Sequence, residues 1–313
     1  MKKICLLYGG NSYEHEISIK SAYNIIKNID IKKYNLTICK LDKDNNFYLM
    51  NNIECKNSLI INPIEFLKEF DKVFPMIHGN PGENGNLFGL LEMYNIPYVG
   101  ASQLANAVCY NKYYTKEILK SNNIPQVEYE VLTSSDKIKT NLDYPVIIKP
   151  SSCGSSIGIN IANNKKELIT HVKEAFKYSN QVLLEKYIKK RELECAILES
   201  KNKLIISTTG EILPDDGFYD YDSKYEKETK LIIPSNIDKN IIRKIQEYSK
   251  KIFKILSLST YSRLDFMYDY NNNKLYFNEV NTIPGFTDIS MYPKLFEYMG
   301  ISMKELITKL IEN

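Results

Sequence analysis

The sequence predicts a multidomain α/β protein, and three observations support this fold class. The chain has 313 residues, more than one hydrophobic core usually serves, so two or three domains are expected. It opens with an apolar run at residues 4–8, a Gly9-Gly10 turn and a helical pattern through Ile29, which is the order of a βαβ unit. Farther along, short apolar runs alternate with helical patterns, as in sheets covered by helices.

Composition excludes several classes of function. The net charge is only +3 and no basic run occurs, so we expect no nucleic-acid partner. No segment is long and apolar enough to span a membrane, and the apolar N-terminal run is too short for a signal peptide. The six cysteines are dispersed without a C-x-x-C pair, and three histidines offer little material for a zinc site. Reduced cysteines indicate a cytoplasmic protein.

The first hundred residues predict a compact α/β domain. Further strands are expected at 35–41 and 72–76, a helix at 86–94 and a short strand at 96–100. The G-x-G-x-x-G pattern is absent, so a dinucleotide site is weakly indicated. Glu14 lies near the carboxyl end of the first strand, where open α/β sheets bind ligands. His78 opens the glycine-rich loop HGNPGENG after the strand at 72–76; we expect it to contact a substrate, with loop packing as the alternative.

The middle of the chain contains two candidate sites for anions. Two short helices are expected between 101 and 119, and Lys112 would stand at the start of the second, an unfavourable place for a cation unless it meets an anion. Strands at 126–131 and 146–149 precede KPSSCGSSIGI, residues 149–159. Small residues there would let backbone N–H groups approach phosphates. We therefore expect a flap over a nucleotide, although a serine-rich hairpin is the simpler alternative and the Walker pattern is missing.

The next segments give weaker signals. After a helix at 165–178 and a strand at 182–184, Glu185 and Glu192 bracket a polar stretch that could hydrogen-bond a nucleotide. Strands at 195–198 and 204–207 are expected to extend a second sheet. The tyrosine-rich loop FYDYDSKY predicts a mobile lid that carries Lys224 and Tyr225 and excludes water. An amphipathic helix at 239–256 and a final helix near 303–311 complete the prediction.

The stretch LYFNEVNTIPGFTDISM, residues 275–291, predicts the centre of the site. Residues 261–268 and 275–281 read as two strands joined by an asparagine-rich turn. A hairpin centred near Asn272 would set Asp265 opposite Glu279 and Arg263 opposite Asn281, all on one face. Two carboxylates and an amide oxygen suit Mg²⁺, which is usually held by carboxylates and substrate phosphates. A solvated charged face is the alternative.

Together these segments resemble the D-alanine–D-alanine ligases of the ATP-grasp superfamily. The motifs that carry the resemblance are, in order, NSYEHEIS, HGNPGENG, IPYVG, IIKPSSCGSSIGI, FYDYDSKY, SRLDF and FNEVNTIPGFTDISMYP. The resemblance implies a three-domain ATP-grasp fold, with a Rossmann-like domain at 1–100, a central subdomain at 101–187 and a catalytic subdomain at 188–313. The nucleotide would lie between the last two, which are α+β subdomains.

The resemblance also implies an activity and a set of site residues. The family joins two D-alanines with ATP and Mg²⁺ through an acyl phosphate, in peptidoglycan precursor synthesis. Two Mg²⁺ ions, or Mn²⁺ in their place, and a homodimer are expected. The implied metal ligands are Asp265, Glu279 and Asn281. ATP would be held by Lys112, Lys149, Ser155, Ser156, Glu185, Glu192 and Lys224, and the catalytic set would be Glu14, Ser155, Tyr225, Arg263, Gly285 and Ser290.

The sequence departs from the family pattern at Asn84, Asn111, Cys153 and Lys190. These departures bear on ATP affinity and loop flexibility rather than on the type of reaction. Two alternatives stay open. One is a D-alanine–D-serine ligase of the same family, which would keep a similar lid, and the other is a nucleotide-binding protein without catalysis.

Overall fold

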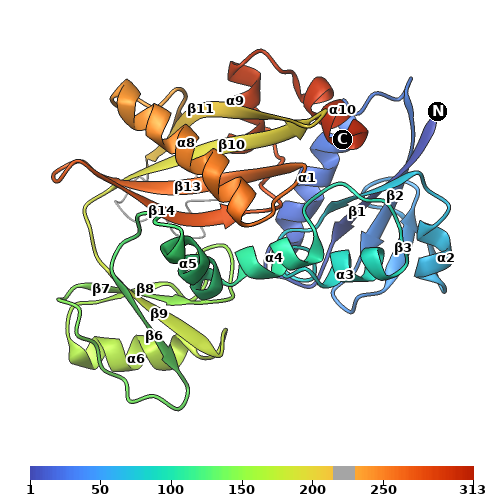
Figure 1. Ribbon diagram of the computed structural model, residues 1–313. Helices are drawn as coiled ribbons and strands as arrows, with labels where there is room; N and C mark the ends of the chain where they lie inside the picture. The colour runs from blue at the N-terminus through green and yellow to red at the C-terminus, as the bar shows by residue number, and fades with distance from the viewer. Residues whose placement is uncertain (214–229) are drawn as a thin grey trace.

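Three β-sheets organise the part of the protein that its computed structural model describes, residues 1–213 and 230–313. In Figure 1 the first sheet lies near both chain termini, the third lies beside the long helix α8, and the second packs on helix α6. Within the described ranges, no helix combines the length and the apolar surface needed to cross a membrane.

The first sheet has the strand order β4-β3-β2-β1-β5. Its strands are β1 (Lys2–Gly9), β2 (Tyr34–Leu41), β3 (Phe47–Met50), β4 (Lys56–Leu59) and β5 (Lys72–Met76), and its helices are α1 (His15–Asn28), α2 (Pro63–Leu67) and α3 (Asn86–Met93). Strand β1 pairs in parallel with β2 and β5, which confirms the predicted βαβ opening. Strands β3 and β4 add an antiparallel extension that was not predicted. The predicted strand at 96–100 is reduced to a single bridge between Val73 and Tyr98.

The second sheet is antiparallel and has its own core. Its order is β6-β9-β7-β8, with β6 (Tyr129–Thr133), β7 (Val146–Pro150), β8 (Asn160–Ala162) and β9 (Gln181–Lys186). Helix α6 (Lys165–Ala175) begins where the Asn164 side chain accepts hydrogen bonds from two backbone N–H groups. Its residues Leu168 and Val172 pack on Val146 and Val182 of the strands. This small core shares no buried residue with the other apolar clusters.

The third sheet has the order β12-β11-β10-β13-β14. Its strands are β10 (Arg191–Ser200), β11 (Lys203–Leu213), β12 (Lys230–Ile232), β13 (Tyr261–Asp269) and β14 (Lys274–Asn281), with helices α8 (Lys239–Ile255), α9 (Met291–Tyr298) and α10 (Met303–Glu312). The strands expected at 195–198 and 204–207 lie here, so the prediction that they extend the second sheet is wrong. Strand β10 pairs with β11 on one side and with β13 on the other. It therefore has no free edge with which a strand of the second sheet could pair.

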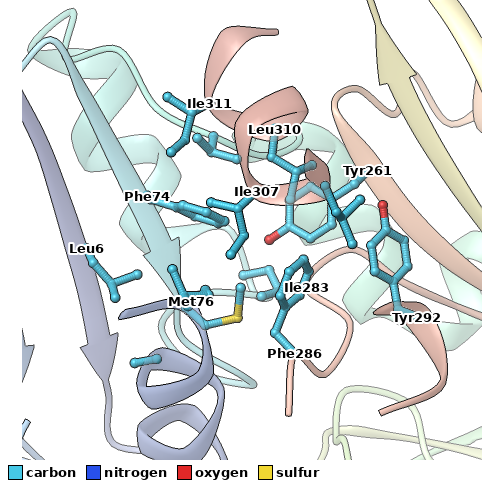
Figure 2. Packing of buried hydrophobic residues seen from close by; sticks show 14 of the residues in the cluster. Leu6, Phe74, Met76, Tyr261, Ile283, Phe286, Tyr292, Ile307, Leu310 and Ile311 are labelled. Atoms are coloured by element: carbon cyan, nitrogen blue, oxygen red, sulfur yellow. The ribbon is translucent and has the colours of Figure 1, made fainter. Parts of the chain in front are cut away.

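One apolar core joins the first sheet to the third. Phe74 and Met76 of β5 belong to the same buried cluster as Ile307 and Leu310 of α10, and Figure 2 shows these side chains with Phe286 close to them. At the rim of this core, Lys2 forms an ion pair of 2.7 Å with Glu312. The first and third sheets therefore form one packed unit.

Helices α4 (Gln103–Tyr110) and α5 (Lys112–Ser121) connect the first sheet to the second. Their apolar side chains, among them Ala105, Cys109 and Leu119, pack into the core of the third sheet together with α8. The predicted domain boundaries, after residues 100 and 187, stay a prediction. The packing adds that the start of the central segment is anchored on the third sheet.

Candidate active site

The hairpin β13–β14 has the predicted register. Asp265 pairs with Glu279 and Arg263 pairs with Asn281, which confirms that the four side chains share a patch. A bulge follows Asp265, and bulges of this kind occur next to active sites, where they re-aim side chains. The turn holds its position because Asp269 accepts hydrogen bonds from the backbone of the asparagine-rich loop.

Arg263 lies between two carboxylates. Its Nε is 2.9 Å from Glu194 Oε2, and its Nε and Nη2 donate to the two oxygens of Asp265 at 2.8 Å each. Asn281 Nδ2 donates to Asp265 Oδ2 at 3.0 Å. The guanidinium is thus fixed in a planar, charge-assisted arrangement. Sequence reasoning missed Glu194, although it lies two residues from Glu192 on β10 and hence on the same face.

Lys112 lies near the metal-ligand candidates. The Asn111 side chain accepts a hydrogen bond from the Tyr114 N–H, so α5 begins at Lys112. Lys112 Nζ donates to the Cys153 carbonyl at 2.7 Å and is 3.6 Å from Glu279 Oε2. The prediction that Lys112 meets an anion is confirmed, and the anion in this structure is the Glu279 carboxylate. The same ammonium ties the loop at 149–159 to the hairpin.

Lys149 belongs to a buried ion triad. Glu185 Oε2 is 2.6 Å from Lys149 Nζ, and Glu185 Oε1 is 2.8 Å from Lys116 Nζ. Burial alone would raise the pKa of Glu185, but the two lysines hold it well below its usual range. Burial alone would lower the pKa of Lys149, and the charge of Glu185 raises it instead. Lys149 Nζ also donates to Asn278 Oδ1 at 3.2 Å.

Sequence reasoning missed Lys116, because one more lysine on a polar helix gives no signal. Its side chain is almost fully buried, and burial lowers its pKa while Glu185 opposes that effect. Glu185 itself lies outside the cavity lining. Its predicted contact with adenosine stays a prediction, and the geometry gives its carboxylate a second task, which is to hold Lys149 in place.

The loop after β7 takes a strained conformation. Ser155 and Ser156 have φ of 50° and 59°, in the left-handed region that costs about 1–2 kcal/mol for each residue other than glycine. Strain of this kind gathers at functional sites. A Cβ on Gly154 would lie 2.9 Å from Glu14 Oε2, so this loop reaches the carboxylate at the end of β1.

A second carboxylate, Glu83, lies in the same region. It belongs to the glycine-rich loop that was predicted, but sequence reasoning did not single it out. Burial, together with the negative charge of Glu14, raises the pKa of Glu83 to about 8. An acid that keeps its proton near neutrality is typical of functional sites.

Gly285 and Ser290 lie together beyond the hairpin. A Cβ on Gly285 would come within 2.7 Å of Ser290 Oγ, so a larger residue there would displace the Ser290 side chain. Ser290 Oγ accepts a hydrogen bond from the Thr287 N–H at 3.0 Å. His78 does not turn a free ring nitrogen to this space, since both of its nitrogens have protein partners, Ser21 Oγ and the Ile283 carbonyl. The contacts favour the packing alternative for His78.

These groups surround one cavity of about 990 Å³, the size of a pocket for a nucleotide or similar ligand. Of the predicted site residues, those that line it are Glu14, Lys112, Lys149, Ser155, Ser156, Glu192, Arg263, Asp265, Glu279, Asn281, Gly285 and Ser290. Lys224 and Tyr225 lie outside the described residues. The cavity brings together side chains from the second and third sheets and from the segments that follow β1 and β5 of the first sheet.

The donor set fits a magnesium ion that arrives with phosphates. In the described part of the chain, no group of three histidine, cysteine or acidic side chains could hold a metal ion by itself. Asp265 and Glu279 supply two carboxylates, and Asn281 supplies an amide oxygen. Because Mg²⁺ commonly takes one or two carboxylates and fills its other positions with phosphate oxygens and water, these residues suit it only as part of a nucleotide complex.

Comparison with known proteins agrees with this site. The family model for the D-ala D-ala ligase N-terminus matches residues 3–101, and that for the C-terminus matches residues 118–312. The D-alanine–D-alanine ligase of Clostridium novyi is 39% identical, over 99% of this chain and 97% of that protein.

Two solved structures extend the likeness to the fold. The VanG D-Ala:D-Ser ligase from Enterococcus faecalis has a TM-score of 0.89 and 32% identity, covering 99% of this chain and 98% of that one. The D-alanine–D-alanine ligase from Bacillus anthracis complexed with ATP has a TM-score of 0.82 and 28% identity, covering 100% and 97%. The mixed α/β architecture is thus the ATP-grasp fold, as predicted. The chain belongs to the D-alanine–D-alanine ligase family.

Proposed function

We propose that this protein is an ATP-dependent ligase that joins two D-alanines into D-alanyl-D-alanine, a precursor of peptidoglycan. One observation carries the proposal beyond family membership. The cavity presents Arg263, Asp265, Glu279 and Asn281 on one hairpin and the lysines Lys112 and Lys149 beside it. Phosphoryl transfer needs positioning and positive charge more than covalent help from the protein, and this set supplies both.

In the first half of the reaction, the carboxylate of one D-alanine attacks the γ-phosphate of ATP, which yields an acyl phosphate and ADP. Lys112, Lys149 and the N–H groups of the Ser155-Ser156 loop bind the phosphates, and Glu192 binds the ribose. Glu14 receives the ammonium group of this first D-alanine. Asp265, Glu279 and Asn281 would hold Mg²⁺, which would neutralise charge on the phosphates.

In the second half, the amine of the other D-alanine attacks the carbonyl of the acyl phosphate. The C–N bond forms, the C–O bond to phosphate breaks, and inorganic phosphate leaves. Arg263 and the Gly285 N–H stabilise the oxyanion of the tetrahedral intermediate, a kind of contact whose loss costs about 10²–10³-fold in kcat. Ser290 binds the carboxylate of the second D-alanine.

The test measures ADP release and dipeptide formation with Mg²⁺ and ATP, with and without D-alanine. We expect both products to depend on D-alanine and the Glu279→Gln variant to lose turnover, because it loses a metal ligand. Glu297→Gln serves as the matched control, since Glu297 is exposed on α9. ATP hydrolysis that is indifferent to D-alanine would refute the proposal and favour a nucleotide-binding role.

A second acceptor deserves a direct comparison because the VanG structure, with a TM-score of 0.89, is named as a D-Ala:D-Ser ligase. Incubation with equal D-alanine and D-serine, followed by product identification, separates the two functions. We expect D-alanyl-D-alanine to dominate, and a majority of D-alanyl-D-serine would assign the other activity. The homodimer, the cytoplasmic location and the use of Mn²⁺ stay predictions.

A further inference from the structure

Ser21 and His78 belong to the first sheet with its helices and loops, which we call the first-sheet unit. Their side chains form a closed hydrogen-bonded circuit with the Ile283–Phe286 segment. The Phe286 N–H donates to Ser21 Oγ at 3.2 Å, Ser21 Oγ is 2.9 Å from His78 Nε2, and His78 Nδ1 is 2.9 Å from the Ile283 carbonyl oxygen. The circuit begins and ends on the segment that contains Pro284-Gly285. It passes through α1 and the loop after β5.

The partners and the burial of His78 together indicate the protonation of the circuit. The Ile283 carbonyl can only accept, so His78 Nδ1 carries a hydrogen and donates it. A neutral imidazole then accepts at Nε2, which means that the Ser21 hydroxyl donates there and accepts from the Phe286 N–H. The ring is taken as neutral because burial lowers the pKa of His78.

A third contact holds the other polar backbone group of Phe286, its carbonyl. Asn24, one turn after Ser21 on α1, donates from Nδ2 to the Phe286 carbonyl at 2.8 Å. Both polar groups of the Phe286 backbone are therefore held by α1, while the phenyl ring is fully buried in the shared core. Ser21, Asn24 and His78 are buried as well, and we name these three residues the turn clamp.

The clamp acts on a closely packed turn. Gly285 lies between the two held positions, and a Cβ there would already touch Ser290 Oγ. Burial strengthens such hydrogen bonds and makes an unpaired partner costly. A shift of about 1 Å in a positioned group can cost about 10²-fold in rate.

We propose that Ser21, Asn24 and His78 are positioning residues for amide-bond formation. They fix the Pro284-Gly285 turn from the side of the first sheet. Their hydrogen bonds go to this turn segment and not to the residues assigned to ATP, although His78 also lines the cavity, so they govern the second half-reaction selectively. The inference rests on the proposed ligase function, because it assigns the Gly285 N–H to the oxyanion.

The experiment separates the two half-reactions in the full-length enzyme. Acyl phosphate formation is followed as D-alanine-dependent exchange of isotopic oxygen between the β,γ-bridge and nonbridge positions of ATP, and amide formation as dipeptide release. We expect His78→Ala to lower dipeptide kcat by about 10- to 100-fold, with isotope exchange and the KM for ATP within about twofold of the wild type. If His78→Ala folds poorly, Asn24→Ala should give the same result, which is slower dipeptide formation with unchanged isotope exchange.

Two controls give the result its meaning. His78→Asn places an amide N–H where Nδ1 donates, so it should recover most of the lost rate. Ser18→Ala removes another fully buried serine of α1, one that bonds Gly9 and Met76 rather than the turn, so it should not separate the half-reactions. Parallel loss of exchange and dipeptide in the clamp variants, or the same split in Ser18→Ala, would overturn the proposal. Absence of D-alanine-dependent exchange in the wild type would instead refute the ligase function.

Discussion

The first and third sheets share one apolar core, whereas the second sheet has a core of its own. The second sheet meets the third through polar contacts, such as Lys149 to Asn278 and Glu185 to Lys116 of the anchored helix α5. Groups assigned to amide formation, Arg263 and Gly285, belong to the shared-core unit. Groups assigned to phosphate binding, Lys149 and the serine loop, belong to the second sheet.

This difference separates the groups that must stay rigid for catalysis from the groups that must move to admit a ligand. Domains joined by modest polar interfaces move relative to each other unless a large apolar interface prevents it. We therefore expect the second sheet to move more readily than the oxyanion donors. The shared core keeps those donors fixed to within the small tolerance that preorganised catalysis requires.

The largest expected effect comes from breaking the shared core. Phe296 is fully buried there, with its ring 5.1 Å from that of Tyr292. Phe296→Ala should lower the free energy of unfolding by about 3–5 kcal/mol, as measured by urea denaturation. Hydrogen exchange should speed up in β1 and β5 as well as in the third sheet, because one core serves both.

Leu168→Ala is the matched change in the core of the second sheet, where Leu168 is also fully buried. Its faster exchange should stay within residues 129–186. If Phe296→Ala left β1 and β5 as protected as before, the two sheets would not behave as one unit, and the comparison would fail.

A smaller effect tests the polar connection. Lys116→Met removes one partner of Glu185 and should cost about 3 kcal/mol, the low end of the range for breaking a buried ion pair, because Lys149 still pairs with Glu185. The KM for ATP should rise several-fold as Lys149 loses its position, while the KM for D-alanine changes little. Lys120→Met, one turn later on α5 and near the same Tyr129 ring, is the control. An unchanged KM for ATP in Lys116→Met would show that the triad only stabilises the fold.

The last prediction concerns Glu83, where the loops of the first sheet meet the cavity. Its folded pKa of about 8 lies above the unfolded value of 4.5, so the folded protein holds a proton that the unfolded chain releases. Stability should therefore fall as the pH rises through that interval and level off above it. Glu83→Gln mimics the neutral acid, and its advantage in Tm over the wild type should grow across the same interval. A constant difference in Tm would contradict the raised pKa.

The sequence predicted the hairpin well because its geometry is local. A turn centred on Asn272 leaves one symmetric register, and period-two alternation then places Arg263 and Asp265 on one face. The strand–turn–helix opening was equally local, since a continuous apolar run followed by glycines has few other interpretations.

What the sequence did not predict depends on contacts between distant segments. Nothing in KYYTK distinguishes Lys116 from a solvated lysine, because its partner Glu185 lies on another sheet. The short strands β3 and β4 carry weak patterns, and β4 is exposed throughout. Helix α9 was also missed. Its apolar residues are explained only by their packing on β10 and β11, and Pro293 in its first turn weakened the helical pattern.

Helix α10 sets the order in which the chain can complete its fold. Four of its side chains, Leu306, Ile307, Leu310 and Ile311, are buried against the first-sheet unit and the residues packed on it. During synthesis, the apolar face of β1 and β5 stays uncovered until α10 has been made, more than 200 residues after β5. Such distant contacts are slow to form and leave apolar surface open to aggregation meanwhile. A ribosome-bound chain that lacks residues 303–312 should therefore bind chaperones and resist folding, even though its second sheet is already complete.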